Sequence, residues 1–227
     1  MSIVTPDGGL TGAGYILCIA AVIILVLAAG LLRPRTSTQK LSTRQLVFSA
    51  AAMALAFVAS YIKIIPELPF GGSVTLMSML FVSLIGYWYG TGVGILTGLA
   101  YGILQFLQGP YVLSFFQVCC DYILAFAGLG LAGVFRKSKN GLLKGYLLGI
   151  MVRGAFHTLG GYLYWMEYMP ENFPAALAGI YPIVYNYSYI LAEGLLTVIV
   201  ILLPPMANAL KQIKRMAAPY PSTQVSR

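Results

Sequence analysis

Seven apolar segments, each long enough to approach the thickness of a bilayer, run through this chain of 227 residues and constrain its fold more than any other feature. A helix needs about 20 apolar residues to cross the hydrocarbon core, and shorter ones are accommodated by bilayer thinning or snorkelling. The segments are Tyr15–Leu32, Leu46–Ile65, Val74–Tyr89, Val93–Leu107, Ser114–Phe135, Leu142–Trp165 and Ala176–Leu203. We therefore expect an all-α polytopic membrane protein.

The composition is unlike that of a soluble domain or of a disulfide scaffold. Hydrophobic residues make up 59% of the chain and charged residues only 9%, whereas a soluble domain carries about 25% charged residues. The three cysteines, Cys18, Cys119 and Cys120, lie in apolar runs and are an odd number, which favours small buried side chains over a disulfide scaffold.

The net charge of +8 comes from basic clusters between the apolar segments, so it indicates membrane orientation and no nucleic-acid partner. The clusters are Arg33, Arg35, Lys40 and Arg44; Arg136, Lys137, Lys139 and Lys144; and Lys211, Lys214, Arg215 and Arg227. Four of the six acids lie in other loops, and they are Asp7, Glu67, Glu167 and Glu171. Basic loops stay inside, so we expect a plasma-membrane protein with its N-terminus outside and its C-terminus in the cytoplasm.

The chain divides into three parts by this pattern. Residues 1–40 are expected to form an extra N-terminal transmembrane helix and a polar linker. Residues 41–215 form a six-helix membrane core, and residues 216–227 form a cytoplasmic tail.

Ionisable side chains inside a bilayer are costly, so they are candidates for function. Three acidic or basic residues qualify, Asp121, Arg153 and Glu193, together with the single histidine, His157. With a rise of about 1.5 Å per residue, Arg153 and Glu193 reach similar depths on antiparallel helices, so we expect them to form a structural ion pair. By the same estimate Asp121 and His157 can line one cavity open to the outside.

If that ion pair neutralises itself, Asp121 remains as an anion in a cavity of low dielectric, which favours a cationic ligand. The aromatic residues near it are Tyr111, Tyr122, Tyr162, Tyr164, Trp165, Tyr181, Tyr185 and Tyr189. An aromatic-walled pocket with a carboxylate is suited to binding delocalised or quaternary cations. The alternative is that these rings form the aromatic belts found at membrane interfaces.

Small residues along the second apolar segment indicate close helix packing. Ala52 and Ala56 give the best small-x-x-x-small match, which serves either a docking surface for another membrane subunit or packing within the bundle. The sequence contains no GxxxxGK[ST] loop and no metal-ligand spacing, so we expect neither ATP binding by this chain nor a metal or other cofactor.

Four segments, taken together, resemble the thiamine-specific substrate-binding (S) component of energy-coupling factor (ECF) transporters. They are LPFGGSVTL (Leu68–Leu76), GPYVLSFFQVCCDYILAF (Gly109–Phe126), RGAFHTLGGYLYW (Arg153–Trp165) and YPIVYN (Tyr181–Asn186). The resemblance covers roughly Leu41–Arg215 and implies a six-helix S-component bundle, with the first span as an addition to it.

The resemblance also implies roles for particular residues. The positions that match the family's vitamin contacts are Asp121, Tyr122, Tyr111, His157, Gly161, Trp165, Tyr181 and Asn186. The family's acid is usually Glu, one methylene longer than Asp121, and Phe70 stands where the first outer loop often carries a Trp. Ala52 and Ala56 match the helix by which S components dock on the transmembrane coupling subunit.

The function implied by this resemblance is high-affinity thiamine capture and uptake, without catalysis by this chain. The partners implied are the transmembrane coupling subunit and two ATPase subunits, in a Gram-positive bacterium. Three alternatives remain open: an S component for another vitamin or for a precursor such as hydroxymethylpyrimidine, a small intramembrane enzyme using His157 and Asp121, and a self-sufficient secondary transporter.

Overall fold

The computed structural model describes residues 11–13, 16, 20, 41–66, 68 and 71–217. The elements in chain order are α2 (Thr43–Tyr61), β1 (Lys63–Ile65), β2 (Val74–Thr75), α3 (Ser78–Tyr89), α4 (Thr91–Gln108), α5 (Phe115–Val118), the π-helix η2 (Cys119–Leu124), α6 (Ala125–Leu129), the 3-10 helix η3 (Gly130–Phe135), α7 (Gly141–Gly160), the π-helix η4 (Gly161–Trp165), the 3-10 helices η5 (Met166–Tyr168) and η6 (Ala175–Ile180), α8 (Tyr181–Leu202) and α9 (Pro204–Ala217). The predicted span Tyr15–Leu32 lies almost entirely outside the described residues.

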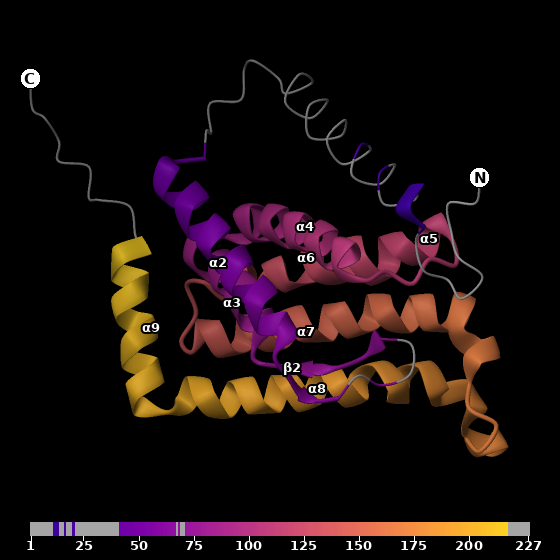
Figure 1. Cartoon of the computed structure of the whole chain (residues 1–227). Helices are drawn as coiled ribbons and strands as arrows, with labels where there is room; N and C mark the ends of the chain where they lie inside the picture. The colour runs from indigo at the N-terminus through magenta and orange to yellow at the C-terminus, as the bar shows by residue number, and fades with distance from the viewer. Residues whose placement is uncertain are drawn as a thin grey trace, which may run out of the picture.

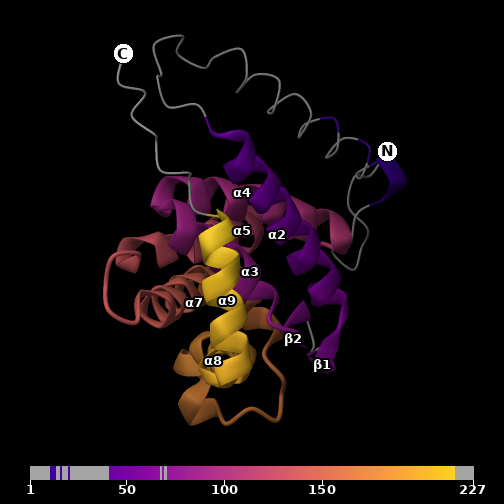
Figure 2. The same ribbon diagram turned by 90° about the vertical axis from the view of Figure 1, so that its left-hand side faces the viewer.

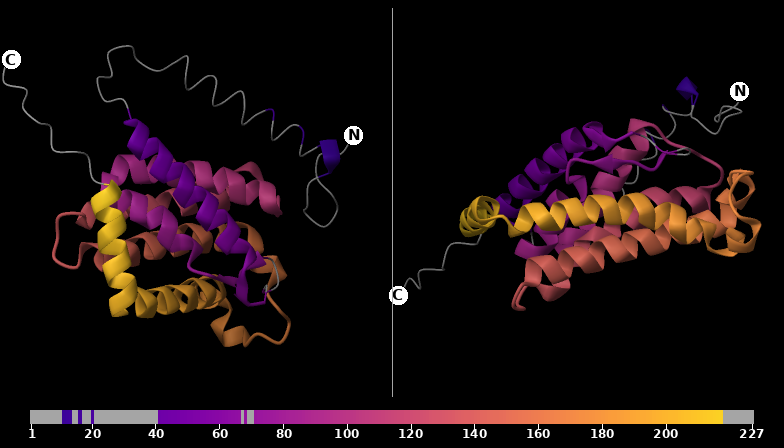
Figure 3. Two further views of the ribbon diagram at one scale, coloured as in Figure 1. Left: turned by 60° about the vertical axis from the view of Figure 1, so that its left-hand side comes forward. Right: turned by 90° about the horizontal axis from the view of Figure 1, so that it is seen from below.

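The described part is an all-α membrane bundle with one small hairpin. The helical stretches long and apolar enough to cross a bilayer are Thr43–Tyr61, Thr91–Gln108, Phe115–Phe135 and Ala175–Leu202, and Ser78–Tyr89 is a shorter apolar helix. Figure 1 shows α4, α6, α7 and α8 running along a common direction, with α2 crossing them obliquely. Figures 2 and 3 show α9 turning across the end of the bundle where α8 stops.

The hairpin was not predicted by hydrophobicity alone. The expected span Leu46–Ile65 ends as a helix at Tyr61, and the expected span Val74–Tyr89 becomes helical only at Ser78. Between them, β1 and β2 pair in antiparallel fashion. Met77 adopts a left-handed backbone conformation with φ 56°, which separates β2 from α3.

The docking role predicted for Ala52 and Ala56 does not agree with their position. Ala52 is 7% exposed and Ala56 is fully buried, because this face of α2 packs inside the bundle, where the Tyr101 hydroxyl donates a hydrogen bond to the Ala56 carbonyl (3.1 Å). Internal packing, the other reading of the alanine pattern, therefore applies to these two residues. The exposed face of α2 carries other small side chains, and these are Ala50, Ala51 and Ala54.

Glycines on α4 let its backbone touch the segment that carries the candidate site. A Cβ on Gly94 would lie 2.7 Å from the Gly130 carbonyl oxygen, and one on Gly98 or Gly102 would collide with the carbonyl oxygens of Phe126 and Tyr122. Such small-residue faces allow close backbone approach between membrane helices. Packing against α4 therefore fixes the position of η2 and α6.

We predict that Gly98→Ala destabilises the protein by about 1–3 kcal/mol, because the added methyl overpacks a backbone contact. Gly92→Ala is the matched control, since nothing lies within 4 Å of a Cβ at that position of the same helix. The thermal midpoint in detergent should fall for Gly98→Ala and stay unchanged or rise for Gly92→Ala. Equal midpoints for the two variants would contradict this packing.

Candidate binding site

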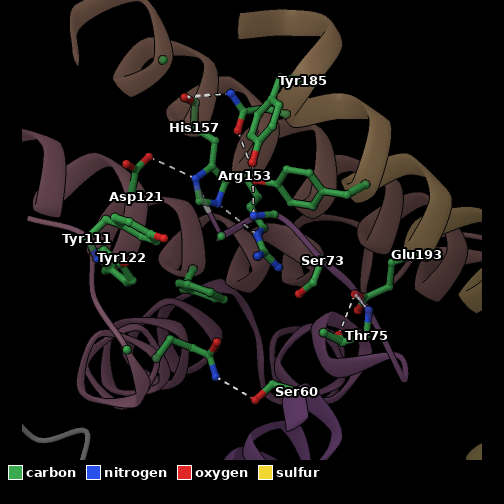
Figure 4. Close-up of a pocket in the computed structure, with 18 of the residues that line it drawn as sticks. Ser60, Ser73, Thr75, Tyr111, Asp121, Tyr122, Arg153, His157, Tyr185 and Glu193 are labelled. Carbon is green, nitrogen blue, oxygen red and sulfur yellow. Dashed lines mark hydrogen bonds and ion pairs between the residues drawn. The ribbon is translucent and has the colours of Figure 1, made fainter. Parts of the chain in front are cut away.

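A cavity of about 420 Å³ is lined by residues at the start of α8, and this is the end of α8 that lies away from α9 (Figure 1). Its walls come from the end of α2, the hairpin, the end of α4, η2, α7, η4 and α8 (Figure 4). The predicted ligand-binding residues that line it are Tyr111, Asp121, Tyr122, His157, Gly161, Trp165, Tyr181 and Asn186. Phe70 lies outside the described residues.

Asp121 is held in this cavity by neutral hydrogen-bond donors. Its Oδ2 accepts from Gln117 Nε2 (2.7 Å) and from Trp165 Nε1 (3.4 Å), and its Oδ1 lies 3.1 Å from His157 Nδ1. Within the described part of the chain, no Lys or Arg side chain lies within 4 Å of the carboxylate. Its charge is therefore stabilised by dipoles and is available to a cationic ligand.

Arg153 fixes the tautomer of His157. The Arg153 Nε lies 3.3 Å from His157 Nε2 and can only donate, so Nε2 must be the unprotonated ring nitrogen. The proton then sits on Nδ1, which donates to Asp121. His157 is therefore a neutral ring between a guanidinium and a carboxylate.

The predicted ion pair between Arg153 and Glu193 is wrong. Arg153 instead contacts His157 and lies over the Phe126 ring, with Cζ 4.4 Å from the ring centroid. Glu193 accepts hydrogen bonds from Thr75 in the hairpin and from Ser78 and Met79 at the start of α3. Helix rise gave the two side chains similar depths but did not determine the direction in which each one points.

Both sides of the site are π-helical. η2 contains Asp121, and η4 contains Gly161 and Trp165. A π-helical turn inserts a residue into the helix and often marks a functional site. The two segments lie close, since Trp165 Nε1 of η4 is 3.4 Å from Asp121 Oδ2 of η2, and a Cβ on Gly160, at the end of α7, would be 2.9 Å from Asp121 Oδ1.

Gly161 lines the cavity and also allows close helix packing. A Cβ there would lie 2.8 Å from Pro182 Cβ and 3.3 Å from Asn186 Nδ2, so the missing side chain allows α7 and η4 to pack on α8.

Aromatic rings form much of the remaining wall. Trp165 packs edge-on against Tyr111, with centroids 5.8 Å apart. On α8, Tyr185 lies 5.9 Å from Tyr181 and 6.0 Å from Tyr189, and Tyr189 contacts the His157 ring. The rings therefore form a continuous aromatic wall along η4 and the first half of α8.

The Asn186 side chain is hydrogen-bonded to other groups of the protein. Its Nδ2 donates to the carbonyl oxygens of His157 (3.2 Å) and Pro182 (2.8 Å), and its Oδ1 accepts from the Tyr189 hydroxyl (3.1 Å). It therefore connects α8 to α7 at the cavity, and the lone pair that remains on its Oδ1 is the part open to a ligand.

Sequence reasoning missed several polar residues of the cavity. Gln117 is 1% exposed and lies one helical turn before Asp121, so a polar side chain at i−4 from a membrane carboxylate could have identified it. Ser60, Gln105 and Gln108 form a hydrogen-bonded group on another wall. Gln105 and Gln108 lie three residues apart on α4, but Ser60 on α2 is 45 and 48 residues away from them, and nothing in the local pattern indicates the contact between these helices.

These features define a class of protein. A multi-spanning helical bundle holds a cavity with aromatic walls and a carboxylate that, among the described residues, contacts a histidine but no Lys or Arg side chain. The described residues contain no group of three His, Cys, Asp or Glu side chains suited to a metal ion. This is a membrane-embedded binding protein for a small organic ligand.

Comparison with known proteins identifies the family. The family model described as thiamine transporter protein matches residues 46–213. Thiamine transporter ThiT of Bacillus subtilis strain 168 is 31% identical over 176 residues, covering 69% of this chain and 85% of that protein. The solved structure of ThiT from Listeria monocytogenes is 26% identical with a TM-score of 0.62, covering 77% of this chain and 97% of that one. The chain belongs to the thiamine transporter family, whose role is transport and not catalysis.

We predict that His157 carries its proton on Nδ1 alone at neutral pH. It is the single histidine of the chain, so ¹⁵N-histidine labelling gives one pair of ring signals. The spectrum should show a protonated Nδ1 and an unprotonated Nε2, because Arg153 donates to Nε2. A proton on Nε2, or on both nitrogens, would contradict the hydrogen-bond order from Arg153 to Asp121.

Proposed function

We propose that this protein captures thiamine in the cavity around Asp121 and delivers it as the substrate-binding component of an ECF-type transporter. The observation that carries the proposal is a carboxylate stabilised by neutral donors beside aromatic rings. The thiazolium of thiamine is a permanent cation, and a cation over an aromatic face gains about 2 kcal/mol or more when both are desolvated. Membership of the thiamine transporter family supports the same ligand.

The cavity chemistry suits both rings of thiamine. The thiazolium can stack on Trp165 or His157 while Asp121 balances its charge, because all three line the same space. The aminopyrimidine offers donors and acceptors that Tyr122 and Asn186 can match.

We propose that the cavity opens to the outside of the cell. The described basic residues at the opposite end of the bundle are Arg44, Arg136, Lys137, Lys139, Lys144, Lys211, Lys214 and Arg215. The positive-inside rule assigns that end to the cytoplasm. A cytoplasmic C-terminus follows, whereas an external N-terminus additionally requires the predicted first span.

The partners are the transmembrane coupling subunit and two ATPase subunits, by resemblance to ECF S components. The surface we assign to docking is the exposed face of α2, which includes the small-x-x-x-small pair Ala50 and Ala54. The docking role that the sequence suggested for Ala52 and Ala56 is assigned to this face because those two residues are buried. Small exposed side chains allow a partner helix to approach the α2 backbone.

We predict that Asp121→Asn weakens thiamine binding by about 100-fold, equivalent to about 2.7 kcal/mol, because it removes the charge that balances the thiazolium. Isothermal titration in detergent measures the effect. Lys211→Ala, a change of charge on exposed α9, should bind like the wild type. Equal effects of the two variants would contradict the site assignment.

We predict that Ala54→Leu reduces co-purification with the coupling subunit and the ATPases while leaving thiamine affinity unchanged. The larger side chain keeps the α2 surface apolar but blocks close helix approach. Ala155→Leu is the matched control, because Ala155 is an exposed alanine on α7. Full recovery of the complex with Ala54→Leu would contradict docking through this face.

A further inference from the structure

The β1–β2 hairpin supplies one wall of the cavity. Gly71, Gly72, Ser73 and Thr75 all line it, and Figure 4 shows Ser73 and Thr75 on the side of Glu193. The sheet of this hairpin has only two strands, and β2 has only two residues. Such a short hairpin has little stability of its own, so its position must come from contacts with the helices.

Glu193 on α8 provides the most extensive of these contacts. Its Oε2 accepts from the Thr75 amide (2.9 Å) and the Thr75 hydroxyl (2.6 Å), and its Oε1 accepts from the Ser78 hydroxyl (3.2 Å) and the Met79 amide (3.3 Å). The residue is 2% exposed. A single carboxylate thus joins α8 to the hairpin and to α3.

These hydrogen bonds need a carboxylate at this position. The first amides of a helix lack partners within it, and the N-cap residue of α3, Met77, provides no side-chain hydrogen bond. Glu193 satisfies the Met79 amide and places negative charge at the positive end of the helix dipole. An ionised carboxylate only accepts, whereas a glutamine would turn its NH₂ group toward one of the two amides, and two N–H donors cannot hydrogen-bond each other.

A second contact holds the same hairpin. The Gly72 amide lies 3.3 Å from the Tyr185 hydroxyl, and a Cβ on Gly72 would lie 2.7 Å from the Tyr189 ring. The hairpin therefore lies directly against the aromatic face of α8. Tyr185 and Glu193 are two turns apart on one side of that helix.

We propose that Glu193 is a positioning residue for ligand binding: it fixes the hairpin wall at residues 71–75 against α8, and affinity depends on it through that wall. The effect on thiamine rests on the proposed function, but the position of the wall does not. Loss of Glu193 should therefore loosen the wall even in the ligand-free protein.

The test measures the accessibility of Ser73 with and without Glu193. Ser73→Cys is introduced after Cys18, Cys119 and Cys120 are changed to Ser, and reaction with a membrane-impermeant maleimide is timed without thiamine. Glu193→Gln should speed labelling by about tenfold and weaken thiamine binding by a similar factor, the effect of losing about 1.4 kcal/mol of hydrogen bonding to a charged group.

Two further variants make the test specific. Glu171→Gln makes the same chemical change at an exposed position and should alter neither measurement. Thr75→Val removes the hydroxyl that lies 2.6 Å from Glu193 Oε2 and 2.7 Å from Ser78 Oγ, and it keeps the Thr75 amide bond to Glu193. It should give an intermediate labelling rate, and it tests the proposal if Glu193→Gln does not fold.

The outcomes separate this proposal from the proposed function. Weaker thiamine binding by Glu193→Gln with unchanged labelling would overturn it, because Glu193 would then act by touching the ligand. Unchanged labelling in both Glu193→Gln and Thr75→Val would overturn it as well. If the wild type failed to bind thiamine, the proposed function would fail, and faster labelling of Glu193→Gln would still support the positioning role.

Discussion

The rest of the structure depends on hydrogen bonding to two carboxylates inside an apolar bundle, Asp121 and Glu193. An ionised carboxylate in low dielectric must be paired or fully hydrogen-bonded, and it offers about four acceptor positions. Glu193 fills them with four donors and is 2% exposed. Asp121 has three donors and a side chain 14% exposed to the cavity. The same chemistry therefore makes one carboxylate structural and leaves the other able to accept a ligand.

Close backbone packing fixes the position of Asp121 at the cavity. The glycine face of α4 contacts the backbone of η2 and α6, and Gly160 lets α7 approach the carboxylate itself. His157 then reaches Asp121 with its Nδ1, while Arg153 occupies its other ring nitrogen. The binding chemistry thus depends on residues without side chains as much as on the polar groups they bring together.

Hydrophobicity and depth predicted the spans of the core and the convergence of Asp121, His157 and Trp165 on one cavity, because these follow from helix length and rise. The rotation of each helix about its axis was not determined by the same pattern. For this reason the sequence did not predict that Ala52 and Ala56 face inward, or that Arg153 contacts His157 and not Glu193. The π-helical turns and the hairpin depend on long-range contacts that no local sequence pattern contains.

Intrinsic fluorescence during thiamine titration tests the central claim most directly. The chain has two tryptophans; Trp165 lines the cavity, and Trp88 packs against Phe48 near the other end of α3. Saturable quenching in the wild type that disappears in Trp165→Phe and persists in Trp88→Phe is the result we predict. Saturable quenching that survives Trp165→Phe unchanged would place the ligand elsewhere and contradict the account.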